Sequence, residues 1–209
     1  MQAGQPPPPR AARVASSGVL IDAGLRALVP SAAVEGATRV WVRDGLGRTT
    51  EASRDDARRG LEPFGVAVLR LAAPLAAADA MLAPRDPFAG SAGHAIEYAA
   101  SADAVPSWPS LHQGFFGAFE GRDGLRRLGI ALLPGSHGGP VFDAAGRLAG
   151  IALPGHDGQG LLLPASMLRA ALPAVAPPPE RSAGATTRMP IDEVYEHALR
   201  VALQVLALP

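Results

Sequence analysis

Short apolar segments recur along most of this chain, and each is closed by glycine, proline or a polar turn. They lie at 13–22, 38–52, 64–75, 93–101, 110–121 and 129–163. These segments either alternate between apolar and polar residues or are continuously apolar, which is typical of strands. Many short strands at regular spacing, separated by glycine and proline turns, predict an all-β barrel or sandwich.

Composition and charge exclude several kinds of chemistry. The chain has 19 basic and 19 acidic residues, so it has no net charge to attract nucleic acid or an anionic membrane surface. It has no cysteine, which excludes disulfides, thiolate catalysis and cysteine-ligated zinc. No apolar run is long enough to cross a membrane. We therefore expect no nucleic-acid partner, no membrane insertion and no cofactor.

Composition also divides the chain into four parts. Residues 1–12 are proline-rich, which predicts a flexible N-terminus, and they hold no apolar core of signal-peptide length, so the sequence as it stands predicts the cytoplasm. Residues 13–172 contain the predicted strands. Residues 173–188 have the proline, glycine, serine and threonine content of a linker.

Residues 189–209 change pattern part of the way along. One set of apolar residues fits a helix face: Ile191, Val194, Tyr195 and Ala198. A second set alternates as in a strand: Leu199, Val201, Leu203 and Val205. The pattern predicts a short helix followed by a strand over Leu199–Leu208.

Five stretches in order carry a family resemblance. They are "SSGVLIDAG" (16–24), "LVPSAAVEGA" (28–37), "GVAVLRL" (65–71), "GSHGGPVFDAAGRLAGI" (135–151) and "GLLLPASML" (160–168). The chain resembles the HtrA (DegP-type) branch of the trypsin-like serine proteases over most of 16–172. That resemblance implies two six-stranded β-barrels with the active site in the cleft between them, one over about 13–75 and one over about 85–172, and a short helix near the C-terminal region.

The resemblance also places the catalytic triad, and all three positions are changed. The family's histidine falls on Ala32, its aspartate on Gly65 and its nucleophilic serine on His137. A serine triad needs a hydroxyl, a base and an orienting carboxylate, and none of these residues supplies the required group. The main-chain N–H groups of a vestigial oxyanion-hole loop, formed by Gly135, His137 and Gly138, would still bind a carbonyl or carboxylate.

These residues predict a bacterial protease homologue that has lost catalysis. We expect it to bind a peptide or protein partner as a scaffold or regulator, by adding a strand beside the cleft. One alternative is a hydrolase or metal-binding protein that uses His137 and Ser136, with His156 as a second metal ligand. Another is a structural module of a larger assembly. The resemblance implies a periplasmic location, in contrast to the N-terminus.

The C-terminal strand has three interpretations. Family members begin with a short helix and a first strand, and here that pattern stands at 189–209 instead of before residue 13. We expect a circular permutation in which Leu199–Leu208 supplies the first strand of the first barrel. The alternatives are exchange of this strand between two copies, which would make a homo-oligomer, and a plain amphipathic helix on the outside of the barrel.

Overall fold

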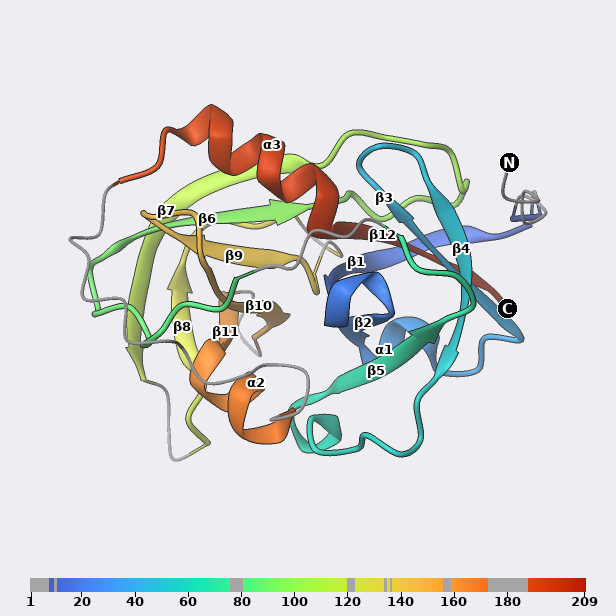
Figure 1. Ribbon diagram of the computed structural model, residues 1–209, viewed down its shortest axis with the longest axis horizontal. Helices are drawn as coiled ribbons and strands as arrows, with labels where there is room; N and C mark the ends of the chain where they lie inside the picture. The colour runs from blue at the N-terminus through green and yellow to red at the C-terminus, as the bar shows by residue number, and fades with distance from the viewer. Residues whose placement is uncertain are drawn as a thin grey trace.

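The computed structural model describes residues 8–9, 11–75, 81–119, 123–133, 135, 137–155, 159–172 and 188–209. Two closed barrels of six antiparallel strands lie side by side (Figure 1). The predicted all-β double-barrel class is therefore confirmed. One hydrophobic core contains residues of both barrels, such as Val29 and Leu203 of the first and Ile96 and Phe142 of the second, so the core is continuous across the interface.

The first barrel is built from both ends of the described chain. In ring order its strands are β1 (Arg13–Ile21), β12 (Ala202–Leu208), β3 (Arg39–Asp44), β4 (Thr49–Arg54), β5 (Val66–Leu71) and β2 (Arg26–Pro30). A one-turn helix, α1 (Ser31–Val34), follows β2, and single 3₁₀ turns lie at Asp22–Gly24 and Glu62–Phe64.

The second barrel uses one continuous part of the sequence. In ring order its strands are β10 (Leu148–Pro154), β11 (Gly160–Pro164), β8 (Arg126–Gly129), β7 (Ser110–Phe119), β6 (Ala92–Glu97) and β9 (Pro140–Asp143). Helix α2 (Ala165–Ala171) follows β11 directly, where the sequence predicted a short helix beginning near Pro164.

The strand expected immediately before the glycine loop is displaced. We expected it from Gly129 onward, whereas β8 ends at Gly129 and residues 131–133 are irregular. Strand β8 lies in a stretch with two arginines that reads as a loop. Arg126 is nevertheless buried, because its guanidinium donates to Gly117 O at 2.8 Å and lies 5.0 Å from the centre of the Phe119 ring.

The C-terminal strand completes its own chain's first barrel. Strand β12 pairs antiparallel with β1 on one side and β3 on the other. Leu203 and Val205 join the main core. Leu206 packs in a small outer cluster, and the Gln204 amide donates to Val105 O at 3.1 Å, so both faces of the strand are covered. A plain helix over the whole segment is therefore wrong; the strand begins at Ala202 instead of Leu199.

Two hairpin turns, one in each barrel, have the same hydrogen bonds. Both follow the pattern D-x-x-G-R, at Asp44–Arg48 between β3 and β4 and at Asp143–Arg147 between β9 and β10. In each turn one carboxylate oxygen accepts the N–H groups of the second and fourth residues onward at 2.9–3.0 Å. The other oxygen accepts the arginine Nε, at 2.8 Å for Arg48 and 2.9 Å for Arg147.

Helix α3 (Ile191–Val201) connects these two turns across the barrels (Figure 1). Just before the helix, the Met189 N–H donates to Ala144 O in the second turn at 2.9 Å. Near its end, Leu199 O accepts the Gly45 N–H in the first turn at 2.8 Å. No helix among the described residues is long and apolar enough to cross a membrane.

Candidate functional site

The three positions that match the family triad lie on separate segments that the fold brings together. Ala32 is exposed in α1, and Gly65 is exposed immediately before β5. The two segments are joined by a hydrogen bond of 2.8 Å from the Ser31 N–H to Gly65 O. His137 precedes β9 in the second barrel and is half-buried.

The loop that carries His137 is fixed against the first barrel. His137 O accepts the N–H of Ser17, a residue of β1, at 2.9 Å. Gly138 lies against both Ser17 and Pro30, since a β-carbon added at Gly138 would overlap Ser17 O and the Pro30 ring. Because Pro30 directly precedes α1, the His137 loop and the Ala32 segment meet at the interface between the barrels.

The glycines of this loop are required by its shape. Gly135 and Gly138 have φ angles of +77° and +99°, which glycine adopts readily and other residues do not. A β-carbon at Gly139 would overlap Ile96 O. The loop is also bonded to β10, because Gly138 N–H donates to Ala152 O at 2.8 Å and Gly139 O accepts the Ala152 N–H at 3.0 Å.

The imidazole of His137 is half-buried in the loop. Burial lowers its pKa, which favours the neutral ring at neutral pH. Its Nδ1 is buried with no hydrogen-bond partner among the described residues. Those residues also contain no group of three or more side chains able to hold a metal ion. The other predicted candidates, Ser136 and His156, lie outside the described residues.

The main-chain N–H groups of the loop differ from one another in whether a carbonyl accepts them. Within the described part of the chain, no carbonyl accepts the N–H of Gly135 or of His137. Two such donors, with no acidic side chain required, are the elements of an oxyanion site. The third residue of the predicted loop, Gly138, uses its own N–H to bind Ala152 O and is a structural member of the loop.

Ser17 and Glu97 were not among the predicted site residues, yet both contact this loop. Both side chains are fully buried, and Glu97 Oε1 lies 3.3 Å from the Gly139 nitrogen, whose N–H it accepts. One feature of the sequence could have indicated Glu97. It is the acidic residue in the otherwise largely apolar run "HAIEYAA", and a strand buried on both faces is expected to be apolar.

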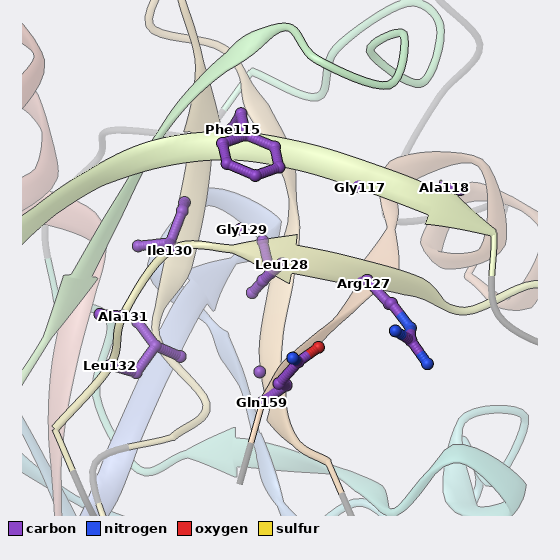
Figure 2. A pocket seen from close by; sticks show the side chains of 11 residues that line it. Phe115, Gly117, Ala118, Arg127, Leu128, Gly129, Ile130, Ala131, Leu132 and Gln159 are labelled. Carbon is purple, nitrogen blue, oxygen red and sulfur yellow. The ribbon is translucent and has the colours of Figure 1, made fainter. Parts of the chain in front are cut away.

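A groove of about 480 Å³ lies on the second barrel, away from the triad positions (Figure 2). It runs between β7, β8 and the start of β11, and Figure 2 shows Phe115, Ile130 and Leu132 around it, with Arg127 at one end. None of its lining residues belongs to the segments that hold Ala32, Gly65 or His137.

The comparisons with known proteins identify the fold through similarity of structure and not through similarity of sequence. No protein-family model and no curated protein matches the sequence. The serine endoprotease from Yersinia pestis superposes with a TM-score of 0.60 and 21% identity, over 76% of this chain and 56% of that one. The HtrA-type protease AlgW, solved with a decapeptide, gives 0.60 and 22%, over 75% and 50%.

A third structure matches over nearly its whole length. The MamO protease domain from Magnetospirillum magneticum has a TM-score of 0.55 and 19% identity, over 78% of this chain and 95% of that one. The chain thus spans little more than half of the Yersinia protein and almost all of a protease domain. Together with the two closed six-stranded barrels, these likenesses show that the chain has the trypsin-like double-barrel fold and is structurally similar to HtrA-type serine proteases.

Proposed function

We propose that this chain is a catalytically inactive homologue of the HtrA-type proteases that binds an extended peptide or protein segment beside the His137 loop. The observation that supports it is the contrast within one site. The positions matched to the triad hold Ala32, Gly65 and His137, which cannot act as base, orienter and nucleophile. The loop nevertheless retains glycine at the two positions where a β-carbon would overlap its neighbours.

An open stretch of strand edge supports the binding mode. On the side of β10 that faces away from β11, pairing with β9 ends at Ile151, and the loop occupies Ala152. Because alternate residues of a strand point their main-chain groups to the same side, Pro154 offers its carbonyl there. No described segment pairs with that side beyond Ala152. A peptide could add as a strand at this edge, although Pro154 supplies no N–H.

The test combines binding and cleavage of an unfolded protein. Fluorescently labelled casein is titrated with the full chain, anisotropy reports binding, and gel electrophoresis reports fragments. A serine-directed fluorophosphonate reports any activated hydroxyl. The variants are Ser136→Ala and His137→Ala, with Ser53→Ala, an exposed serine of β4, as the matched control.

We expect saturable binding of casein with neither fragments nor label in any variant. Cleavage or labelling that disappears in Ser136→Ala would mean a relocated nucleophile and would refute the loss of catalysis. Activity that disappears in His137→Ala and with a metal chelator would indicate metal-dependent hydrolysis. Neither binding nor cleavage would leave the structural-module hypothesis, in which the surface of the barrels holds neighbouring proteins.

We also propose that the order of the strands reflects a circular permutation of the HtrA-type domain. Helix α3 and β12 stand last in the sequence, but β12 lies between β1 and β3, where it forms an antiparallel pair with β1. Ala207 is opposite Arg13, so the last residues lie beside the start of β1 (Figure 1). A short hairpin could join these two ends and place α3 and β12 before β1.

A further inference from the structure

Ser17 is a connection between the barrels at the candidate site. It lies in β1 of the first barrel, and its side chain is fully buried. Its N–H donates to His137 O at 2.9 Å, and its Oγ accepts the Tyr98 N–H at 2.7 Å. One residue of the first barrel therefore holds both the His137 loop and the segment that follows β6 in the second.

The carboxyl of Glu97 is part of the same cluster. Its Oε1 accepts the Gly139 N–H at 3.3 Å, whereas Oε2 has no hydrogen-bond partner among the described residues. The Ser17 hydroxyl donates to Tyr98 O at 3.4 Å, and its proximity to the carboxyl lowers the pKa of Glu97. Gly139 is pressed against the Glu97 carboxyl and Ile96 O, so the loop and the carboxyl cannot move independently. The carboxyl thus fixes the segment 137–139 from the side opposite the solvent.

Among the described residues, no positive charge faces this carboxyl from the elements packed against it. Strand β1 contributes Ser17, the loop contributes His137, whose pKa burial lowers, and β6 is followed by Tyr98, whose pKa burial raises. Across the β6–β7 ladder the partner of Glu97 is Ser110. An ionised carboxylate would be costly in such surroundings, because the side chain is fully buried and no described cation faces it.

Burial raises the pKa of Glu97 to about 8, and hydrogen bonds from Ser17 and Gly139 partly oppose that rise. A carboxyl with a pKa above its usual value near 4.5 favours the folded state in its protonated form. Its contribution to stability is complete below about pH 4.5 and is lost as the pH rises through about 8. The Glu97 carboxyl therefore loses its proton within a pH range that proteins encounter.

We propose that Glu97 is a protonation-controlled positioning residue: its neutral carboxyl stays buried behind the His137–Gly139 loop, and loss of its proton to solvent leaves a buried charge whose hydration draws the carboxylate toward water and releases the loop. The proposal adds regulation to the site of the proposed function. Its biological role rests on that function, whereas the movement of the loop does not. The loop movement itself requires no bound peptide, so its test is independent of peptide binding.

The test is a pH titration of the full chain by ¹H–¹⁵N NMR between pH 5.5 and 9.5. The amides of Ser17, Tyr98, Gly138 and Gly139 report the cluster, and amide exchange rates report release of the loop. We expect these four amides to titrate with a midpoint near pH 8 and Gly139 exchange to accelerate above it. The signal is separable from the ionisation of His137, whose pKa lies below its usual 6.5.

Two variants and a control make the assignment specific. Glu97→Gln is expected to abolish the transition near pH 8, and Glu193→Gln, an exposed acid on α3, to leave it unchanged. Ser17→Ala removes a hydrogen bond that lowers the pKa of Glu97, so the midpoint is expected to move upward. A group with only a structural role would produce no such shift.

A wild-type chain without this transition, or a Glu97→Gln chain that keeps it, would overturn the proposal. If Glu97→Gln does not fold, the Ser17→Ala midpoint decides, and a midpoint that stays or moves downward would also overturn it. Casein binding separates the two proposals. The transition without binding would leave the switch intact and refute the proposed function, whereas binding without the transition would do the reverse.

Discussion

Gly138 and Gly139 act at the smallest scale, because the shape of the His137 loop depends on missing β-carbons. Gly138 lies against Ser17 and Pro30 of the first barrel, and Gly139 against Ile96 and Glu97 of the second. These close contacts let main-chain atoms of the two barrels meet, which is how His137 O reaches the Ser17 N–H. These contacts involve main-chain atoms, so the architecture of the loop does not depend on a catalytic hydroxyl.

Replacing Gly139 by alanine is expected to lower the free energy of unfolding by about 1–3 kcal/mol, because the new methyl group overlaps Ile96 O and the structure must shift to accept it. Urea unfolding followed by circular dichroism measures the change. Gly60→Ala is the matched control, since a β-carbon there meets only Ala171 at 3.4 Å, and its effect should stay within about 0.5 kcal/mol. Equal effects at the two glycines would contradict this account.

Single elements show where local pattern and environment disagree. The sequence "SWPSLHQGFFGAF" predicts that its aromatic residues are mainly core, and only Phe116 is buried. Phe115 and Phe119 are exposed because β7 presents alternate residues to the outside, where Phe115 borders the groove (Figure 2). Trp108 is exposed in the segment that precedes the strand. Periodicity predicts the strand correctly, but the side of the strand that faces the barrel interior depends on its partners.

The two D-x-x-G-R turns predict a matched pair of effects. Asp44→Ala and Asp143→Ala each leave two backbone N–H groups without their acceptor, so each should lower the free energy of unfolding by about 1–2 kcal/mol. Asp→Asn at either position should have a smaller effect, because the amide oxygen still accepts. Differential scanning calorimetry measures all four variants. Asp56→Ala is the control, as its exposed carboxylate pairs only with nearby Arg59.

The double variant shows whether the turns are coupled. Distant, independent sites have additive effects within about 0.5 kcal/mol. Helix α3, however, is hydrogen-bonded close to both turns, through Met189 and Leu199. Additive losses of the free energy of unfolding would mean that each turn acts within its own barrel. A loss in the double variant that clearly exceeds the sum of the single losses would mean that the two turns are coupled through α3.

At the scale of the whole molecule, the last strand determines closure of the first barrel. Without β12, strands β1 and β3 would each expose an unpaired edge, and Leu203 and Val205 would be missing from the core. Continuity of the core through both barrels makes cooperative folding of residues 11–172 without this strand unfavourable. The candidate site therefore depends on the C-terminal strand, because β12 pairs with β1 and β1 carries Ser17.

A rearranged chain tests this dependence together with the permutation. It begins at Met189, runs to Pro209, continues through a short glycine–serine linker into Ala11 and ends at Leu172. We expect it to unfold cooperatively, with a free energy of unfolding within about 2 kcal/mol of the original chain, because every described strand pair is retained. Residues 11–172 alone serve as the control and should lack a cooperative transition. Failure of the rearranged chain to fold would contradict a permuted origin.

The features that the sequence predicts well are local ones. Alternation and turn residues indicate most of the strands, and the glycine loop and both D-x-x-G-R turns are visible as letters. Strand β8 is the exception, since the guanidinium of the buried Arg126 donates to Gly117 O and lies beside the Phe119 ring. Gly117 and Phe119 lie on the neighbouring strand β7, so the sequence around Arg126 does not indicate that its side chain is buried.

The candidate site divides in the same way. The assignment of Ala32, Gly65 and His137 to the triad positions follows from the resemblance to family motifs, which the sequence alone displays. The fold brings in Ser17 and Glu97, whose separation along the chain hides that both are hydrogen-bonded to the same loop.

By itself, the sequence determined a chain of short strands, the places where it turns, and a glycine-rich loop that carries His137. Only the tertiary structure decided that β12 lies between β1 and β3 and that a buried, uncompensated carboxyl lies behind the His137 loop. The physical reason is that strand pairing and burial are non-local. A strand's hydrogen-bond partners, and the dielectric around a carboxyl, are supplied by residues far away in the chain.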